Sequence, residues 1–221
     1  MKNNKMNNKL KKLRDVWNFL CNGNSIWSWI FNIVVAFLLI KFVFYPGIGL
    51  LLKTDYPIVA VVSESMEHGQ SFDSWWNSDA DCGYICKQSD FYAIYNITSE
   101  DFQKFNFKNG FNKGDLIIVI GKKPEQIKVG DVIVFMGYVR DKRAPIIHRV
   151  IKKFYNENVN QYYFQTKGDH NTRSLYSEMQ ISKQDILGVG IFRIPYLGYV
   201  KLWFVDFLIR IGVVRADEVL S

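Results

Sequence analysis

The sequence predicts a mainly β domain of antiparallel strands, attached to a membrane by one helix near the N-terminus. An apolar run that starts at Ile26 and reaches Pro46 has about the twenty residues needed to span a bilayer core. After it, the chain changes to short runs of β-branched and aromatic residues separated by turn signals. A chain of 221 residues is long enough for one such domain and short for two.

The positive charge of the chain is concentrated at its start. The formal net charge is +7, and residues 1–25 hold six Lys or Arg against one Asp. A nucleic-acid-binding domain would carry its positive charge on the folded part. A basic segment directly before an apolar run instead predicts a cytoplasmic tail. We therefore expect no nucleic-acid partner.

Residues 26–47 are predicted to form a transmembrane signal anchor. Ser28, Asn32 and Lys41 are the polar residues that interrupt the run before Pro46. A cleavable signal peptide would be shorter and would end at a small-residue cleavage site, and a buried helix of a soluble protein would alternate with polar residues. An anchor of this kind places the rest of the chain on the outer face of the membrane.

Residues 48–194 are predicted to form the β-rich domain. Its turn signals include Lys-Gly-Asp at 113–115 and Val-Gly-Asp at 129–131. Short strands bounded in this way are typical of antiparallel sheet. The expected strands are 58–62, 116–120, 132–135, 146–154, 162–165 and 186–192.

Residues 67–113 do not fit this strand pattern and are interpreted as an insertion. They are rich in Asp, Asn and aromatic residues and show no strong periodicity, which indicates an inserted subdomain or a mobile functional segment. Cys82 and Cys86 lie within them and are able to form a disulfide if this region faces an oxidising space. A structural zinc site would need two more soft ligands, so no metal is predicted.

Residues 195–221 are predicted to form a C-terminal helix that either lies in the membrane interface or crosses the membrane. Lys201, Asp206 and Arg210 interrupt its apolar sequence, which makes a spanning helix costly. Asp206 and Arg210 are four residues apart and are expected to pair on one helix face.

A serine segment directly follows the predicted strand 58–62. It reads Ser-Glu-Ser-Met-Glu and contains Ser63 and Ser65. A serine at the end of a buried strand is held rigidly beside a groove, and the edge of the strand is free to pair with an extended peptide. Serine turns also cap strands that have no catalytic role, so this segment alone leaves both interpretations open.

Two further segments carry residues suited to peptide cleavage. His148 lies in an alternating strand, where its neighbours point to the opposite face. An imidazole can take a proton from a serine and return it to the leaving amine. Asp169 follows the next strand in a Gly-Asp turn, where it either caps backbone groups or orients an imidazole.

Taken together and in this order, these segments resemble the type I signal peptidases of the archaeal and endoplasmic-reticulum kind. The resemblance covers the anchor, 58–67 and 113–200, and leaves out most of the insertion. Its motifs are S-x-S-M-E after a Val-rich strand, K-G-D-L, I-K-V-G-D-V-I-V-F, I-x-H-R-V, T-K-G-D-x-N, D-I-L-G and I-P-Y-L-G. No single motif is decisive, whereas their combined order is specific.

The resemblance implies a membrane-anchored signal-peptidase-like antiparallel β catalytic domain with a Ser-His site. Ser65 would be the nucleophile, His148 the general base, Asp169 the acidic partner and Ser63 a support of the oxyanion site. The strand that would bind the substrate consists of Ile58, Val59, Ala60, Val61 and Val62.

Two departures from the family pattern leave part of the site open. His68 stands where the family usually has Pro, which puts a rival histidine three residues from Ser65. The family often has a second Asp about six positions after the Gly-Asp, and Leu175 occupies that position here. Glu178 and Asp185 are the remaining candidates for the acidic partner.

The implied function is removal of N-terminal signal peptides from secreted preproteins by cleavage after small residues, with no metal or organic cofactor. Expected partners are preprotein signal peptides, membrane lipid and the protein-export machinery. The expected location is the cell membrane, or the endoplasmic-reticulum membrane in a eukaryote. Alternatives are an anchored β-domain binding protein with an inactive serine site and a related protease for a dedicated surface-protein precursor. A lipid or ester hydrolase is disfavoured because no G-x-S-x-G elbow surrounds Ser65.

Overall fold

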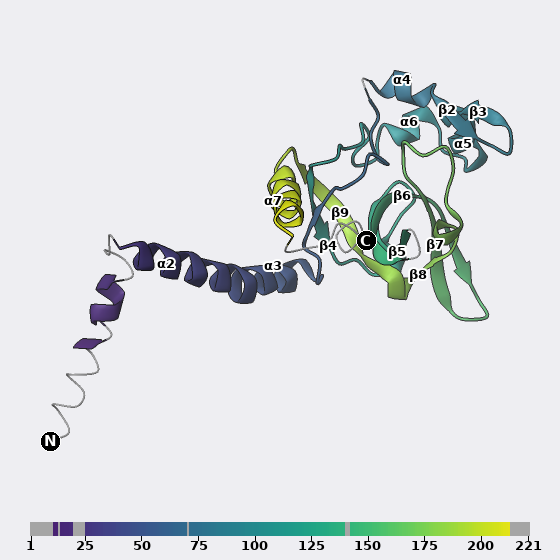
Figure 1. Ribbon diagram of the computed structural model, residues 1–221. Helices are drawn as coiled ribbons and strands as arrows, with labels where there is room; N and C mark the ends of the chain where they lie inside the picture. Colours follow the sequence, from purple (N-terminus) through teal and green to yellow (C-terminus); the bar gives the residue numbers. More distant parts are fainter. Residues whose placement is uncertain (1–10, 13, 20–24, 70, 140–141, 213–221) are drawn as a thin grey trace. The chain divides into compact units, whose positions relative to one another are not determined.

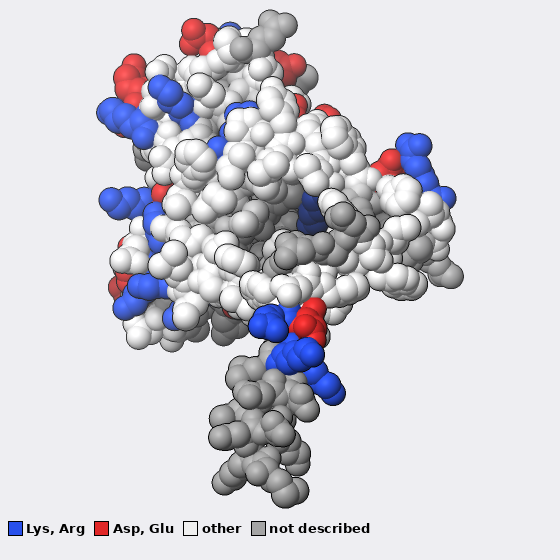
Figure 2. Space-filling view, turned by 90° about the vertical axis from the view of Figure 1, so that its left-hand side faces the viewer, with Lys and Arg blue, Asp and Glu red and all other residues white. Residues whose placement is uncertain are grey.

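The computed structural model describes residues 11–12, 14–19, 25–69, 71–139 and 142–212, and the chain divides into two compact units, residues 1–51 and 52–221 (Figure 1). In the first unit, Lys and Arg side chains gather in one cluster (Figure 2). The described residues there include Lys11, Lys12 and Arg14. This is the basic segment that precedes the apolar run.

The apolar run of the first unit is one continuous helix, Ile26–Leu52, of 27 residues. It is built from α2 (Ile26–Leu39), a π-helical stretch η1 (Ile40–Phe44) and α3 (Tyr45–Leu52). Within η1, the N–H of Tyr45 donates to Ile40 O, five residues back. This wide turn lets the helix pass Pro46, which lacks an N–H group. The helix therefore extends beyond residue 47, the expected end of the anchor. By length and composition, it is the one helix in the described residues able to cross a membrane.

The second unit contains a seven-stranded antiparallel sheet in the order β1-β4-β9-β5-β6-β7-β8 (Figure 1). This confirms the predicted fold class. Strand β1 lies at the end of the order and pairs with β4 alone. The strands are β1 (Ile58–Ala60), β4 (Leu116–Ile120), β5 (Val132–Val139), β6 (Lys142–Asn156), β7 (Gln161–Lys167), β8 (Ile181–Ser182) and β9 (Ile186–Ile194).

The observed strands follow the predicted runs, with one difference at the site. Strand β1 ends at Ala60, two residues before the predicted end, because Val61 leaves the ladder. Its N–H instead donates to Asp115 O at 2.9 Å, and its carbonyl accepts from Gly114 N–H at 2.9 Å. The chain is thereby fixed just before the serine segment. Strand β8 was not predicted, since a two-residue strand carries no detectable alternation.

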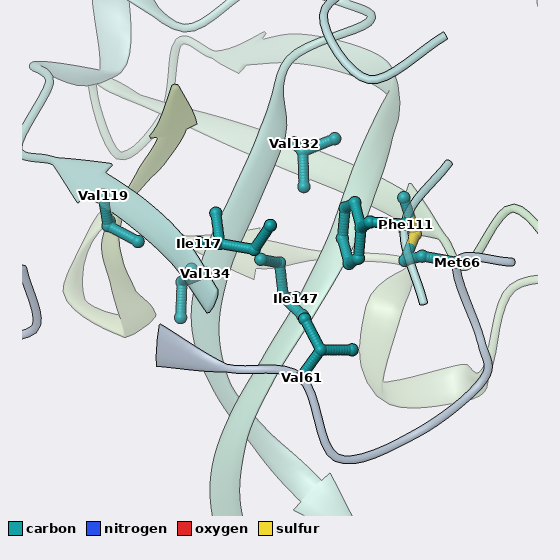
Figure 3. Close-up of a cluster of buried hydrophobic side chains, with 8 residues drawn as sticks. All are labelled: Val61, Met66, Phe111, Ile117, Val119, Val132, Val134 and Ile147. Atoms are coloured by element: carbon teal, nitrogen blue, oxygen red, sulfur yellow. The ribbon is translucent and has the colours of Figure 1, made fainter. Parts of the chain in front are cut away.

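A buried apolar cluster lies beneath the serine segment (Figure 3). Met66 and Phe111 lie next to each other in it, and Val61 lies beside Ile147 (Figure 3). Burial of each such side chain contributes about 1.5–3 kcal/mol. The cluster consists of Val61, Met66, Phe111, Ile117, Val119, Val132, Val134 and Ile147.

The segment 67–113 forms a folded subdomain with a buried aromatic core of its own. Trp75, Tyr92 and Phe102 are at most 3% exposed and contact one another with ring centroids 4.9–5.8 Å apart. Its elements gather in one group at the upper right of Figure 1. They are α4 (Phe72–Trp76), β2 (Asp79–Asp81), β3 (Ile85–Lys87), α5 (Gln88–Ile94) and α6 (Ser99–Phe102).

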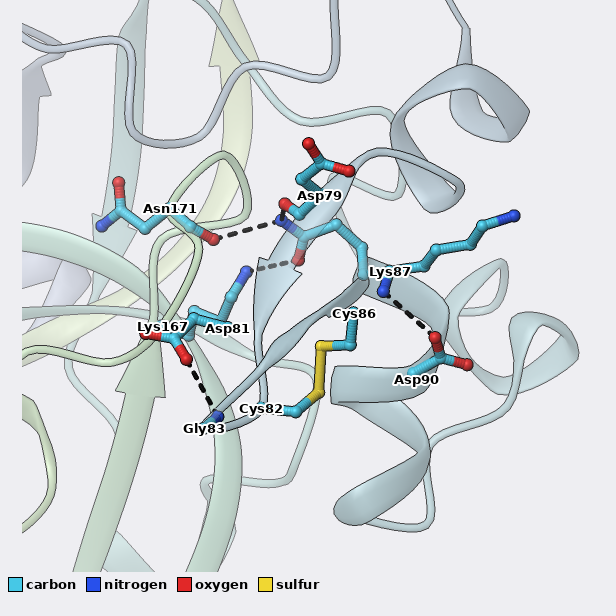
Figure 4. The surroundings of a disulfide bond; sticks show 10 residues. Asp79, Asp81, Cys82, Gly83, Cys86, Lys87, Asp90, Lys167 and Asn171 are labelled. Atoms are coloured by element: carbon cyan, nitrogen blue, oxygen red, sulfur yellow. Dashed lines mark hydrogen bonds between the residues drawn. A yellow bond between two sulfur atoms is a disulfide. The ribbon is translucent and has the colours of Figure 1, made fainter.

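Cys82 and Cys86 form a disulfide across the β2–β3 hairpin (Figure 4). The two strands of the hairpin are three residues each, and a hairpin this short is marginal without a further constraint. The bond supplies that constraint.

The chain continues into the C-terminal helix α7 (Tyr199–Arg210). Arg210 Nε lies 2.9 Å from Asp206 Oδ2, which is the pair expected from their spacing. The 12 described residues of α7 are fewer than the about twenty that a spanning helix needs.

Replacement of Phe111 by Ala should lower the free energy of unfolding by about 3–5 kcal/mol, because it opens a cavity in the cluster beneath the serine segment. Phe111 is fully buried. Urea unfolding of the full chain in detergent, followed by tryptophan fluorescence, measures the change. The matched control is Phe192→Ala, whose ring is 61% exposed, and it should change stability by less than about 0.5 kcal/mol. Equal effects of the two substitutions would contradict the assigned core.

Candidate active site

Ser65 lies between two anchored core residues. Val61 and Met66 are 2% and 1% exposed, whereas Ser63 is exposed and Ser65 half-buried. Met66 O accepts from Phe111 N–H at 3.0 Å, and Met66 Sδ accepts from the Asp169 N–H at 3.4 Å. The serine hydroxyl is therefore presented at the surface from a backbone that is held on both sides.

Ser65 and His148 form a hydrogen-bonded pair. Ser65 Oγ lies 2.9 Å from His148 Nε2, and His148 is 5% exposed. His148 is a residue of β6, and its ring is fixed by the sheet. Nucleophile and base within hydrogen-bonding distance are the signature of an activated serine.

The carboxylate that contacts His148 is Glu178. Its Oε1 is hydrogen-bonded to His148 Nδ1, and the carboxylate is fully buried. Thr166 Oγ1 donates to the same oxygen at 3.2 Å, and the Leu175 N–H donates to Oε2 at 2.8 Å. With Nδ1–H donating to Glu178, His148 Nε2 is left as the acceptor for the Ser65 hydroxyl, which is the tautomer that a general base requires.

Asp169 occupies a different place from the one expected of an acidic partner to His148. Its carboxylate accepts from Arg149 Nε at 2.9 Å and from Arg149 Nη2 at 2.7 Å. It is also 2.9 Å from His68 Nε2 and accepts from Tyr92 Oη at 3.1 Å. The physical reason is strand alternation, since Arg149 points to the face opposite to His148 and draws the carboxylate there.

The buried charges around Asp169 compensate one another. Burial alone would raise the pKa of Asp169, but the Arg149 guanidinium and the hydrogen bonds from His68 and Arg149 hold that pKa well below its ordinary value. Burial and the negative charge of Asp169 together raise the pKa of Tyr92 well above its ordinary value. Asp169 is thus a carboxylate and Tyr92 a neutral hydroxyl donor.

His68 does not replace His148 at the serine. It stacks on Trp75 with ring centroids 3.8 Å apart and contacts Asp169 through Nε2. Its Nδ1 is buried and has no hydrogen-bond partner among the described residues.

The turn after β7 lies directly against the Ser-His pair. A Cβ at Gly168 would come within 2.7 Å of Ser65 O and 2.8 Å of His148 Nε2, so only glycine fits. The His170 N–H donates to Ser65 O at 2.8 Å. The position of this turn therefore affects the position of Ser65.

The remaining expected site residues lie as follows. Ser63 Oγ is 3.1 Å from Ser65 Oγ. Ile58, Val59 and Ala60 form the edge strand β1, and Val62 is 60% exposed. Asp185 pairs with Arg143 at 2.8 Å and accepts from Ser182 Oγ at 2.8 Å.

No group of three or more His, Cys, Asp or Glu side chains suited to a metal ion occurs in the described part of the chain.

Lys167, the residue before Gly168, is fully buried without a salt bridge in the described structure. Its Nζ donates to Gln88 Oε1 at 2.7 Å and to Gly168 O and Asp169 O at 3.1 and 3.2 Å. Burial lowers the pKa of Lys167 to about 7, and the charges of Asp169 and Glu178 oppose this only partly.

The chain is similar in sequence to known proteins, although no family model matches it. It is 28% identical over 168 residues to the signal peptidase complex catalytic subunit SEC11 of Zygosaccharomyces rouxii, which covers 73% of this chain and 74% of that protein. The corresponding subunit of Lachancea thermotolerans gives the same values. The human signal peptidase complex catalytic subunit SEC11C is 36% identical over 102 residues, 44% of this chain and 52% of that protein.

The buried Lys167 should make stability depend on pH. Between pH about 7 and its ordinary pKa of 10.5 the folded lysine is neutral while the unfolded one is protonated, so the unfolded state binds more protons and stability rises with pH. Below pH 7 both states are protonated and the destabilisation is complete. The urea midpoint should therefore rise between pH 7 and pH 9 in the wild type and rise less in Lys167→Met.

The control for this measurement is Lys108→Met, since Lys108 is exposed. It should follow the wild-type pH dependence. If the Lys167→Met curve also ran parallel to that of the wild type, Lys167 would be protonated throughout the range and the assigned pKa would be wrong.

Proposed function

Because the chain belongs to the type I signal peptidase family of the archaeal and endoplasmic-reticulum kind, we propose that it is a membrane-bound serine endopeptidase that removes N-terminal signal peptides from secreted preproteins. The observation that supports this most directly is the 2.9 Å contact between Ser65 Oγ and His148 Nε2, with Glu178 on the other ring nitrogen. No metal or organic cofactor takes part.

In the proposed acylation step, Ser65 Oγ attacks the scissile carbonyl carbon. His148 Nε2 accepts the serine proton, and Glu178 stabilises the imidazolium that forms. As the tetrahedral intermediate collapses, the C–N bond breaks and His148 gives the proton to the leaving amine. The mature protein departs, and the signal peptide remains as an ester of Ser65.

In deacylation, water attacks the ester carbonyl while His148 takes one of its protons. The C–O bond to Ser65 breaks, the proton returns to Ser65 Oγ and the signal peptide leaves with a free carboxylate. In both steps negative charge develops on the carbonyl oxygen. The Ser63 hydroxyl, 3.1 Å from Ser65 Oγ, is proposed to donate to it, an interaction worth about 2.7–4 kcal/mol per donor.

The substrate is proposed to bind as an added strand beside β1. This strand ends the sheet and pairs only with β4 in the described structure, so its other edge is free to bond an extended peptide. The contacts would come from Ile58 to Ala60 and from Val61 and Val62 beyond the strand. Specificity for small side chains would come from shallow apolar pockets on this edge.

The helix Ile26–Leu52 is proposed to anchor the enzyme with the N-terminus in the cytoplasm, because basic residues precede it. The catalytic domain then lies on the outer face, which in a eukaryotic cell is the lumen of the endoplasmic reticulum. The relatives are named as subunits of a signal peptidase complex, and further proteins of the export machinery are proposed as partners here. Membrane lipid surrounds the anchor.

The binding-protein alternative is not favoured. That alternative depends on the absence of an acid at position 175, which is Leu. The carboxylate of Glu178 instead contacts His148 Nδ1. A protease for one dedicated precursor uses the same site and differs only in its substrates. A panel of unrelated signal sequences distinguishes these two, because a general signal peptidase cuts several of them after small residues.

Ser65→Ala and His148→Ala should each abolish cleavage of a purified preprotein in detergent or lipid, with kcat reduced by about 10⁶-fold. The new N-terminus of the product is sequenced to locate the cut. Ser89→Ala serves as the control, because Ser89 lines a pocket of the subdomain with Trp76 and Ala93 that includes none of the proposed catalytic residues. Full activity of Ser65→Ala would refute the catalytic assignment.

Glu178→Gln should lower kcat by about 10⁴-fold while the protein remains folded, since an amide cannot stabilise the imidazolium and favours the wrong tautomer. Asp185→Asn is the matched control and should retain full activity, because Asp185 pairs with Arg143 on the surface. Asp169→Asn should instead lower stability by about 3–5 kcal/mol, because it leaves Arg149 buried without its carboxylate. If Asp169→Asn were folded but inactive while Glu178→Gln remained active, Asp169 would be the acidic partner of His148 and Glu178 would not.

A further inference from the structure

We propose that the subdomain formed by 67–113 is an internal brace of the active site, in which Trp75, Tyr92 and Gln88 are positioning residues that hold the turn Gly168–Asn171 against Ser65. The proposal rests on the proposed peptidase function and assigns a role to a segment that the catalytic mechanism does not use.

The turn is in a position to move the nucleophile. The His170 N–H donates to Ser65 O, and His170 Nδ1 lies 3.2 Å from Glu67 O. Gly168 lies so close to Ser65 O and His148 Nε2 that even a Cβ would collide with them. Displacement of the turn therefore changes the distance between the serine and its base. A misplacement of about 1 Å is enough to cost about 100-fold in rate.

The subdomain holds this turn through side chains directed at its backbone and its carboxylate. Trp75 Nε1–H donates to Asp169 O at 2.8 Å, and Tyr92 Oη donates to Asp169 Oδ1 at 3.1 Å. Gln88 Oε1 accepts from Lys167 Nζ at 2.7 Å, and Gln88 Nε2 donates to Asn171 O at 3.2 Å. The residue before the turn and the last residue of the turn are thus held by one amide side chain.

The disulfide-bonded hairpin adds a backbone contact. The Asp81 N–H donates to Thr172 O at 3.0 Å, one residue after the turn. In Figure 4, Lys167 and Asn171 lie beside the hairpin that carries Cys82 and Cys86. The hairpin is closed by the disulfide, and α5 follows it directly from Gln88. The contacts to the turn therefore start from a stiff element.

The contacts of Gln88 orient the turn and do not neutralise the charge of Lys167. Gln88 is 1% exposed and binds the buried Lys167 with a neutral oxygen. A carboxylate there would compete with Asp169 for the charges of Lys167 and Arg149. The neutral amide fixes the strand end without disturbing the Arg149–Asp169 pair.

Trp75→Phe and Trp76→Phe form the matched pair that tests the brace. Both tryptophans belong to the same aromatic core, but only Trp75 has a hydrogen bond to the turn in the described structure. Trp75→Phe keeps an aromatic ring over His68 and removes the N–H donor. It should lower kcat about 10- to 100-fold at unchanged KM, with an unchanged pH optimum and an unfolding midpoint close to that of Trp76→Phe.

Tyr92→Phe is the second variant and serves if Trp75→Phe fails to fold. It removes a single hydroxyl and should conserve the fold. It should likewise lower kcat and leave KM unchanged, whereas Trp76→Phe should retain at least half of the wild-type kcat. Equal kcat for Trp75→Phe, Tyr92→Phe and Trp76→Phe would overturn the brace. A rise in KM without loss of kcat would also overturn it and would indicate substrate binding by the subdomain.

A fluorophosphonate probe that labels reactive serines separates failure of the brace from failure of the proposed function. If wild type neither cleaves preprotein nor takes up the probe while Ser65→Ala behaves identically, the peptidase assignment fails. If wild type cleaves and is labelled at Ser65, the function stands, and the labelling rates of the Trp75 and Tyr92 variants decide the brace. Labelling slowed in step with kcat supports it, and labelling at the wild-type rate contradicts it.

Discussion

The buried ion pair between Arg149 and Asp169 is the interaction on which the site depends. Both side chains are 0% exposed, and the guanidinium also donates to Gly130 O, Asn106 O and Phe107 O. One side chain thereby joins the sheet, the end of the inserted subdomain and the turn beside Ser65. An unpaired charge at this depth costs several kcal/mol, so the pair forms only when all three parts are in place. Arg149 follows His148 in β6. Alternation along the strand directs His148 toward the proposed catalytic pair with Ser65 and Arg149 toward the ion pair with Asp169.

Much of the fold was predictable from local patterns. The apolar helix, the antiparallel class and the strands β4 to β7 and β9 follow from residue periodicity and turn signals, which are properties of short stretches of sequence. The subdomain was not predictable beyond its existence, because its elements are three to seven residues long and their stability comes from contacts among aromatic rings. A short helix such as α4 has no periodicity to detect. The passage of the anchor helix beyond Pro46 also escaped prediction, since it depends on one π-helical turn.

In the site too, some features follow from local sequence and others depend on tertiary contacts. Ser65 and His148 were predicted as a pair from a serine after a strand, an alternating histidine and the order of several motifs, and the structure brings their side chains into contact. The position of the acid was not settled in this way, because the hydrogen-bonding partner of His148 is fixed by the fold around it. A single turn of 3-10 helix, Tyr176–Glu178, brings Glu178 back over Thr166 to the imidazole. Asp169 has the motif position, but the adjacent Arg149 determines which way its carboxylate points.

The two buried carboxylates differ in what neutralises them, and this difference supports the separate roles proposed for them. Asp169 faces the permanent positive charge of Arg149. Because that charge already compensates the carboxylate, Asp169 would stabilise a transient imidazolium only weakly. Glu178 is hydrogen-bonded by a hydroxyl and a backbone N–H, which are neutral donors that orient its oxygens without cancelling the charge. In the proposed mechanism, the charge of Glu178 is therefore available to the imidazolium that forms when His148 takes the serine proton. Exchange of the two surroundings, rather than of the residues, would be required to exchange the roles.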